Sequence, residues 1–227
     1  MTPGQFVRSH PLLRDLTATE AAALIGQSFV KSLPARSTVF VEGDVGDGVY
    51  GVLTGSVLVT VGSARGDDLI LSVLTPGRLF GELAVLDGGG RTATIVTRTP
   101  SRLLFISRAL FLRVIATHPH LAAGVGALLG VYLRRNTRLA SDAAFRDVAG
   151  RLARQLIELD AGVSAGESPC ATIQVSQYEL ACMLGVSREI VNRHLTSWRR
   201  AGLVEMSRGH LRVVDSRAMQ ALAADPT

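Results

Sequence analysis

The chain has 227 residues, which is enough for two domains of ordinary size, each with its own hydrophobic core. Hydrophobic residues make up 47% of the chain and aromatic residues 5%, a composition that excludes an intrinsically disordered protein and indicates aliphatic cores. The 24 basic and 19 acidic residues leave a formal net charge of +5, a modest excess whose placement along the chain matters more than its size.

The N-terminal part of the chain carries the signals of a short helix followed by a β-rich domain. Thr17 stands three residues before Glu20, which is the spacing of a capping box that opens a helix over residues 17–27. Residues 29–106 then consist of short β-branched runs broken by glycine, with no helical periodicity of useful length. Many short strands with turn signals predict a compact antiparallel sandwich or barrel.

Helical periodicity begins after Arg108. A first helix is expected over residues 109–118, and Pro119 stands in the first turn of a longer helix that we expect to end near Phe145. Five residues of the long helix recur at steps of four, three, four and three: Leu129, Leu133, Asn136, Ala140 and Ala143. This seam is suited to a partner helix and predicts a homodimer, although a stripe that packs on the sandwich would have the same period.

The last third of the chain is predicted to be a helix-turn-helix with a wing. A helix ends near Gly162, and a turn-rich loop, AGESPCAT, follows it at residues 165–172. Ser176 and Glu179 form a capping box before the first helix of the motif, and a glycine-bearing turn separates it from the second helix at residues 188–202. Residues 203–215 predict a hairpin with Arg208-Gly209 at its tip, and a short helix follows Asp215. Residues 187–212 contain six arginines and two acids, a local surplus that makes nucleic acid a candidate partner.

The stretch GELAVLDGGGRTA, at residues 81–93, contains groups suited to a sugar phosphate. Arg91 can bind two phosphate oxygens, Thr92 can donate a hydroxyl hydrogen bond, and Gly81 lets the backbone approach. Phosphate would repel Glu82, which therefore belongs at the ribose hydroxyls, where an acceptor is needed. The alternative is a surface turn in which Glu82 and Arg91 form an ion pair.

This stretch resembles the phosphate-binding cassette of cyclic-nucleotide-binding domains. SREIVNRHL, preceded by AFRDVAGRLARQL, is similar to the recognition-helix and hinge regions of the cyclic AMP receptor branch of the CRP/FNR superfamily of bacterial transcription regulators. The resemblance covers residues from about Val30 to Val214 in the same order. It implies an α+β fold with an N-terminal antiparallel β-roll, a long dimerisation helix and a C-terminal winged helix-turn-helix, at residues 1–117, 118–146 and 147–227.

The resemblance also implies the ligand and the residues that bind it. Glu82 would contact the ribose 2′-hydroxyl, Arg91 and Thr92 the cyclic phosphate, and the backbone of Gly81 and Leu83 would complete the cassette. Asn136 and Thr137 correspond to two polar residues that reach the purine, one from each subunit, although a single Asn on a helical seam can instead fix its register. The expected effector is cyclic AMP. Cyclic GMP is possible, because Thr92 replaces the commoner serine.

The second helix of the motif is expected to read DNA. Capped at Ser187, it places Arg188 and Glu189 in its opening turn and Asn192 and Arg193 one turn later, all toward the major groove. Arginine pairs with guanine and glutamate accepts from cytosine, so the set predicts G·C pairs. The resemblance implies a palindrome of TGTGA-like half-sites. The alternative is an intrahelical Glu189–Arg193 ion pair.

The sequence indicates neither an enzyme nor a metalloprotein. No histidine is spaced to pair with a nucleophile, and Cys170 and Cys182 form neither a CxxC pair nor a zinc pattern. No iron–sulfur cluster or haem is expected, since both cysteines lie in the C-terminal third and no haem ligand stands near Thr75 or Pro76.

The expected partners are double-stranded DNA, a second copy of the chain and RNA polymerase. A cytoplasmic protein is expected, because no apolar run is as long as a membrane span and the first residues lack a secretory pattern. The alternative function is a CRP/FNR-type regulator that responds to another ligand or to none and uses the β-roll only for dimerisation.

Overall fold

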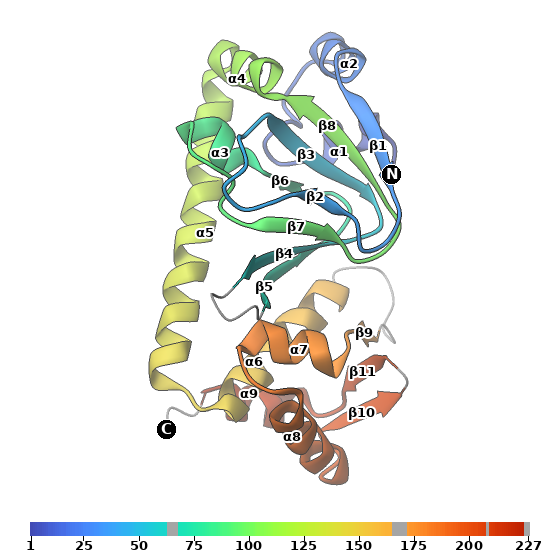
Figure 1. Cartoon of the computed structure of the whole chain (residues 1–227), viewed down its shortest axis with the longest axis vertical. Coiled ribbons are helices and arrows are strands. Elements are labelled where there is room, and N and C mark those ends of the chain that lie inside the picture. Colours follow the sequence, from blue (N-terminus) through green and yellow to red (C-terminus); the bar gives the residue numbers. More distant parts are fainter. Residues whose placement is uncertain (63–67, 165–171, 208, 225–227) are drawn as a thin grey trace. The chain divides into compact units, whose positions relative to one another are not determined.

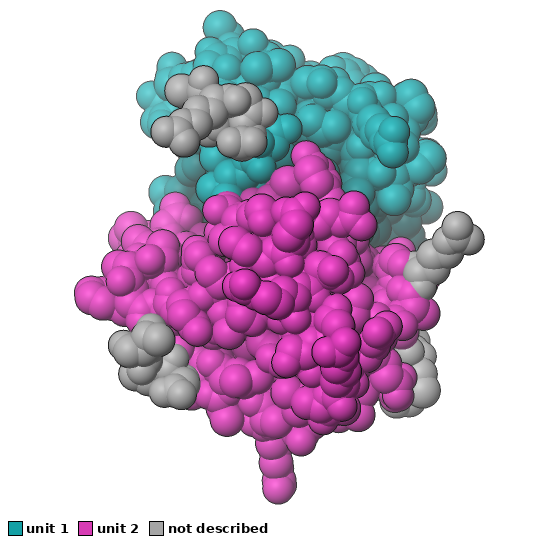
Figure 2. Space-filling view, turned by 60° about the horizontal axis from the view of Figure 1, so that its bottom comes forward, with its two compact units in different colours: residues 1–132 teal, residues 133–227 magenta. Residues whose placement is uncertain are grey.

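The computed structural model describes residues 1–62, 68–164, 172–207 and 209–224. The chain divides into two compact units, Met1–Tyr132 and Leu133–Thr227, which Figure 2 shows in different colours. This division falls inside the long helix α5, Pro119–Phe145. The three-part division with boundaries after residues 117 and 146 remains a prediction.

The first unit contains the expected antiparallel β-roll (Figure 1). It consists of two four-stranded sheets, with strand orders β1-β8-β3-β6 and β2-β7-β4-β5, in which all paired neighbours run antiparallel. The strands are β1 (Phe29–Leu33), β2 (Thr38–Phe40), β3 (Gly48–Thr54), β4 (Val57–Gly62), β5 (Asp68–Leu74), β6 (Leu79–Phe80), β7 (Thr94–Thr97) and β8 (Ser101–Ser107).

Strand β3 is buried on both faces, which explains why its sequence reads as an apolar run and not as an alternating pattern. Tyr50 and Val52 point to the core between the two sheets. Val49 and Leu53 belong to a second core, which the sheet shares with the helices that cover it. The roll therefore has an inner core and an outer core, and β3 contributes to both.

The first unit also contains the first part of α5 and, in its described residues, four short helices: α1 (Pro3–Ser9), α2 (Ala18–Gly26), α3 (Glu82–Asp87) and α4 (Arg108–Thr117). The capping box predicted for α2 is confirmed, since Glu20 N donates to Thr17 Oγ1 at 3.3 Å and Thr17 N donates to Glu20 Oε2 at 2.9 Å. Helices α1 and α3 were not predicted. Helix α3 is only six residues long, and left-handed glycines flank it at 81 and 88, so helical periodicity could not show it.

His118 stands where α4 meets α5 and ties this elbow to α2. Its Nε2 lies 2.9 Å from Glu20 Oε1, and its Nδ1 lies 2.9 Å from the Val114 carbonyl oxygen. Hydrogen bonds lower the pKa of Glu20 to about 2, the largest of them from Thr17, and the Glu20 bond is the main cause of the raised pKa of His118. The elbow is thus fixed by a charged hydrogen bond at the surface of the first unit.

Helix α5 begins at Pro119, as predicted, and the residues of its expected seam are exposed. Leu133, one of the largest apolar side chains of the seam, is 69% exposed. Among the described residues, no single helix has the length and hydropathy of a membrane span; α4 and α5 together do, as a pair bent by 113°.

The second unit contains the predicted helix-turn-helix and wing. The three-stranded antiparallel sheet has the order β10-β11-β9, and β10 and β11 form the expected hairpin. Arg208 at its tip, the loop at residues 165–171 and Cys170 within it lie outside the described residues. The elements are α6 (Val148–Ser164), β9 (Ile173–Gln174), α7 (Gln177–Leu184), α8 (Arg188–Arg200), β10 (Val204–Ser207), β11 (His210–Val213) and α9 (Ser216–Ala224).

The last turns of α5 are joined to α6 and α9 by a buried ionic cluster. Asp142 is 8% exposed and accepts hydrogen bonds from Arg146 Nε at 2.9 Å and from Arg154 Nη1 at 2.9 Å. Both arginines also donate to the carbonyl oxygen of Ala223, near the end of α9. Arginine is favoured at the end of α9 because no N–H group of the helix donates to its last carbonyl oxygens, which also carry a partial negative charge.

Candidate functional site

Glu82 is the buried acceptor of the candidate ligand site. It opens α3 and is 3% exposed. The Tyr132 hydroxyl donates a hydrogen bond to its carboxylate, while Oε2 has no partner among the described residues. Burial raises the pKa of Glu82, and the Tyr132 bond and the Arg91 charge act in the opposite direction. A hydroxyl-bearing ligand would supply the donor that Oε2 lacks.

Arg91 is the buried donor of the same site, with 2% exposure. Its guanidinium donates to the Gly81 carbonyl at 2.7 Å, to the Gly48 carbonyl at 2.8 Å and to Asp47 Oδ1 at 2.6 Å. The ring of Phe40 lies against its face, with 4.1 Å between the guanidinium carbon and the ring centroid. Nε is buried and has no partner among the described residues, so its N–H group is available to bind an anion.

Gly81 is required by the site for two independent reasons. Its φ is +82°, a left-handed conformation that residues with a Cβ rarely adopt. A Cβ built at this position would also lie 2.5 Å from Arg91 Nη1. A larger residue would therefore displace the guanidinium itself.

The alternative of a surface turn with a Glu82–Arg91 ion pair is wrong. Both side chains are buried, and the carboxylate paired with Arg91 belongs to Asp47. Of the other cassette residues, Leu83 is half-buried in α3 and Thr92 is exposed next to Arg91. Their contacts with a ligand remain predictions.

Three residues of this site were not predicted from the sequence: Asp47, Phe40 and Tyr132. Asp47 stands in the loop GDVGDG just before β3, where glycines and acids together could have indicated a tight turn near a ligand. Tyr132 precedes Asn136 by one helical turn and could have been found from that spacing. Phe40 carries no signal, because an aromatic residue in a strand is ordinary.

Asn136 and Thr137 lie on α5 in the second compact unit, and both are exposed. Their role at the purine remains a prediction.

Helix α8 presents the predicted reading residues on one exposed face. Arg188, Glu189, Asn192 and Arg193 are all exposed. The opposite face is buried and includes Trp198, which is 7% exposed and is a core residue, as expected. The burial pattern therefore leaves the charged face of α8 free to contact another molecule.

Ser187 is the N-cap of α8 by position, but its side chain does not cap the backbone. Its hydroxyl hydrogen-bonds the Glu189 carboxylate instead, and the pKa of Glu189 is lowered by its own backbone N–H first and by Ser187 and Arg188 next. Glu189 therefore remains an ionised acceptor, as reading a cytosine amino group requires. The alternative Glu189–Arg193 ion pair does not occur in the described part of the chain.

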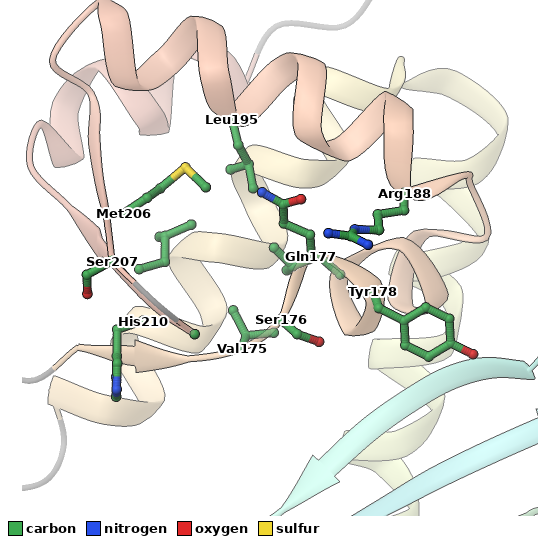
Figure 3. Close-up of a pocket in the computed structure, with 12 residues that line it drawn as sticks. Val175, Ser176, Gln177, Tyr178, Arg188, Leu195, Met206, Ser207 and His210 are labelled. Atoms are coloured by element: carbon green, nitrogen blue, oxygen red, sulfur yellow. The ribbon is translucent and has the colours of Figure 1, made fainter.

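A cavity of about 490 Å³ lies between the start of α7, helix α8 and the β10–β11 hairpin (Figure 3). Its polar lining includes Gln177 from α7, Arg188 from α8 and His210 from the hairpin. In Figure 3 the Gln177 side chain extends from α7 toward α8, next to Arg188. One of the predicted reading residues, Arg188, and the β10–β11 hairpin thus border one cavity in the second unit.

Two family models match the chain. The cyclic nucleotide-binding domain matches residues 30–118, and the Crp-like helix-turn-helix domain matches residues 150–222. The matched segments contain the cassette and the reading helix, respectively.

Three proteins are similar to this chain over 87% or more of its length. The chain is 32% identical over 200 residues to the CRP-like cAMP-activated global transcriptional regulator of Mycobacterium tuberculosis, which covers 87% of this chain and 89% of that protein. It is 29% identical to the cyclic AMP receptor protein of Thermus thermophilus, covering 96% and 98%. A solved structure, the c-di-GMP responsive global regulator CLP of Xanthomonas campestris, is 28% identical with a TM-score of 0.75, covering 88% and 100%.

The matched domains follow one another in the order predicted from the cassette and the helix-turn-helix. The relatives extend across both domains, so their similarity includes α5. The chain belongs to the CRP/FNR superfamily of DNA-binding transcription regulators.

Proposed function

We propose that the protein is a homodimeric transcription regulator that responds to a cyclic nucleotide. The observation that carries the proposal is the presence in one site of two buried polar atoms, Glu82 Oε2 and Arg91 Nε, that have no partner among the described residues. A buried polar atom without a hydrogen bond raises the free energy of the folded protein. Binding of a ligand that hydrogen-bonds both atoms is therefore favoured. A ribose hydroxyl beside a cyclic phosphate offers the required donor and acceptor.

Cyclic AMP is the proposed effector, and cyclic GMP is the alternative nucleotide because Thr92 follows Arg91. The names of the Mycobacterium and Thermus relatives, which refer to cyclic AMP, support this proposal. The c-di-GMP responsive Xanthomonas regulator favours a second candidate, in which the β-roll serves dimerisation and the chain responds to another ligand or to none. Neither candidate uses a metal, haem or iron–sulfur cluster.

The α5 helix is proposed to form the dimer and to link ligand to DNA. Its seam residues are exposed in the single chain, which supports pairing with a second copy. Asn136 and Thr137 would contact the purine, so that ligand binding favours one arrangement of the two reading helices through differential contacts. Replacing both by alanine should weaken this coupling more than it lowers stability.

The reading residues Arg188, Glu189, Asn192 and Arg193 are proposed to recognise a palindrome of TGTGA-like half-sites, centred about one helical turn apart. Their exposure and the ionised Glu189 support this assignment. A regulator of this kind would act in the cytoplasm with RNA polymerase as a further partner.

The deciding experiment is a titration with cyclic AMP, cyclic GMP and cyclic di-GMP, in which both the melting temperature and the affinity for DNA are measured. A ligand at 100 times its Kd stabilises the folded state by about 2.7 kcal/mol, which a thermal scan detects readily. The proposal predicts a rise in melting temperature and in DNA affinity with a cyclic mononucleotide. An unchanged melting temperature with all three ligands would contradict it and favour the ligand-independent regulator.

A further inference from the structure

The side-chain oxygen of Asn192, in the second turn of α8, accepts two hydrogen bonds within the protein. Gln177 Nε2, at the start of α7, donates to Asn192 Oδ1 at 3.2 Å. The Thr196 hydroxyl, one turn further along α8, donates to the same oxygen at 3.4 Å. Gln177 and Thr196 are half-buried, whereas Asn192 is exposed.

These two bonds determine what Asn192 can offer to another molecule. An amide oxygen has two lone pairs, and both are occupied here. The amide nitrogen retains two N–H donors, and the side chain lies on the exposed face of α8. Asn192 is therefore a donor without a free acceptor.

We infer that Asn192 reads base edges only as a hydrogen-bond donor, and that Gln177 and Thr196 are the positioning residues that impose this polarity. The inference rests on the proposed DNA-binding function of α8. An asparagine with a free amide binds adenine through two bonds, one accepted from N6 and one donated to N7. Asn192 cannot accept the first, so it should favour guanine N7 and O6 or thymine O4 and should not favour adenine.

A purely structural role for the Gln177–Asn192 bond gives a different result. If the bond only joined α7 to α8, removing it would lower the melting temperature and weaken binding to all DNA sequences alike. A role in polarity changes the relative preference among bases at one position. The profile of base preferences therefore separates the two roles.

The test begins with a selection of binding sites from randomised duplex DNA by the full chain, read position by position. Comparing the wild type with Asn192→Ala identifies the base pair that Asn192 reads. At that position, Gln177→Ala, Thr196→Val and the double variant should increase the preference for adenine, by about tenfold in the double variant, because a bidentate pair regains its acceptor. Gln220→Ala, an exposed change on α9, is the matched control and should leave the profile unchanged.

A second variant replaces the hydrogen-bond donor at position 177 by an acceptor. Gln177→Glu offers only acceptors, so the Asn192 amide should turn and donate to the new carboxylate, leaving its oxygen free. The added charge should weaken binding to all DNA sequences. The preference at the Asn192 position should nevertheless move toward adenine and cytosine, which present amino groups in the major groove.

Three results would overturn the inference: an Asn192-dependent preference for adenine in the wild type, a profile that Asn192→Ala leaves unchanged, or Gln177 variants that alter affinity without altering the profile. If the proposed DNA-binding function were wrong, the result would differ from all three, because the wild type would then select no inverted repeat.

Discussion

The predicted charged residues of the candidate ligand site are buried, whereas those of the reading helix are exposed. In the first unit, Glu82 and Arg91 are almost fully buried, and each has one polar atom that no described residue satisfies. In the second unit, Arg188, Glu189 and Arg193 are exposed to solvent. Buried charges are expensive to desolvate and must be held in place, whereas exposed charges cost little and can be exchanged. Substitutions should therefore affect affinity and stability in the ligand site, and mainly selectivity on the reading helix.

The largest effect is expected for Arg91→Leu, which removes the buried cation of the ligand site. Binding of cyclic AMP, measured by calorimetry, should weaken at least 100-fold, because a charge-assisted contact to phosphate is worth several kcal/mol when its partner is left buried. Arg102→Leu, an exposed change on β8, is the control and should bind like the wild type. Equal affinity in the wild type and Arg91→Leu would remove the basis of the ligand assignment.

A smaller loss is expected for Gly81→Ala, which tests whether the position of the guanidinium matters beyond its charge. The new Cβ would approach Arg91 Nη1 closely, so affinity for the nucleotide should fall by about tenfold or more while Arg91 is retained. Gly77→Ala is a matched control, since Gly77 also has a positive φ, of +90°, but has open space around its Cβ position. If both variants lose the same stability and neither loses affinity, backbone strain alone explains the glycine.

On the reading helix, Glu189→Ala should leave the melting temperature almost unchanged, because Glu189 is exposed. Discrimination at one base pair of the half-site should fall by about 1 to 3 kcal/mol in competition binding. Arg199→Ala, further along α8, should weaken all sequences about equally and reduce the salt dependence of binding. If Glu189→Ala instead lowered the affinity for all DNA sequences equally, as expected for Arg199→Ala, Glu189 would not read a base.

The smallest effect concerns the His118–Glu20 bond, a charged contact outside both sites. The raised pKa of His118 stabilises the fold below its usual value of 6.5, and this contribution is lost as the pH rises through the raised pKa. The lowered pKa of Glu20 stabilises the fold above 4.5, and this contribution is lost only as the pH falls toward about 2. The contact is therefore at full strength between pH 4.5 and 6.5.

His118→Gln should accordingly lower the melting temperature slightly at about pH 6 and have less effect at about pH 9, as thermal scans across this range would show. His120→Gln provides the control, since His120 is exposed and makes no ion pair in the described part of the chain. A difference between wild type and His118→Gln that does not change with pH would exclude the charged contact.

The sequence predicted the elements whose signals are local. The capping boxes at Thr17 and Ser176, Pro119 at the start of α5 and the glycine after α7 each depend on a few neighbouring residues, and all are present. Glu82 and Arg91 could be named because they share one short motif. Their burial in one site was implied only by resemblance.

The residues that escaped prediction act across long sequence distances. Asp47 is 44 positions from Arg91, its hydrogen-bond partner. Tyr132 reaches Glu82 from another helix, and Gln177 reaches Asn192 from α7. A local signal can mark one member of such a pair, as the spacing to Asn136 does for Tyr132, but no periodicity links the two members, so the pairing itself is seen only in the folded chain. Helix α3 escaped for a different reason, because six residues are too few to complete two turns of a periodic pattern.

The ionic cluster at Asp142 fixes the position of the last turns of α5 relative to α6 and α9. Two guanidinium groups share one carboxylate and one carbonyl oxygen, and these bonds are directional. An apolar contact can slide by fractions of an ångström, but this cluster must either keep its register or break, since breaking it would leave the buried Asp142 carboxylate without its partners. The end of α5 is therefore rigidly attached to α6 and α9. A movement of α5 would either carry these two helices with it or break the cluster, and it would not tilt them gradually.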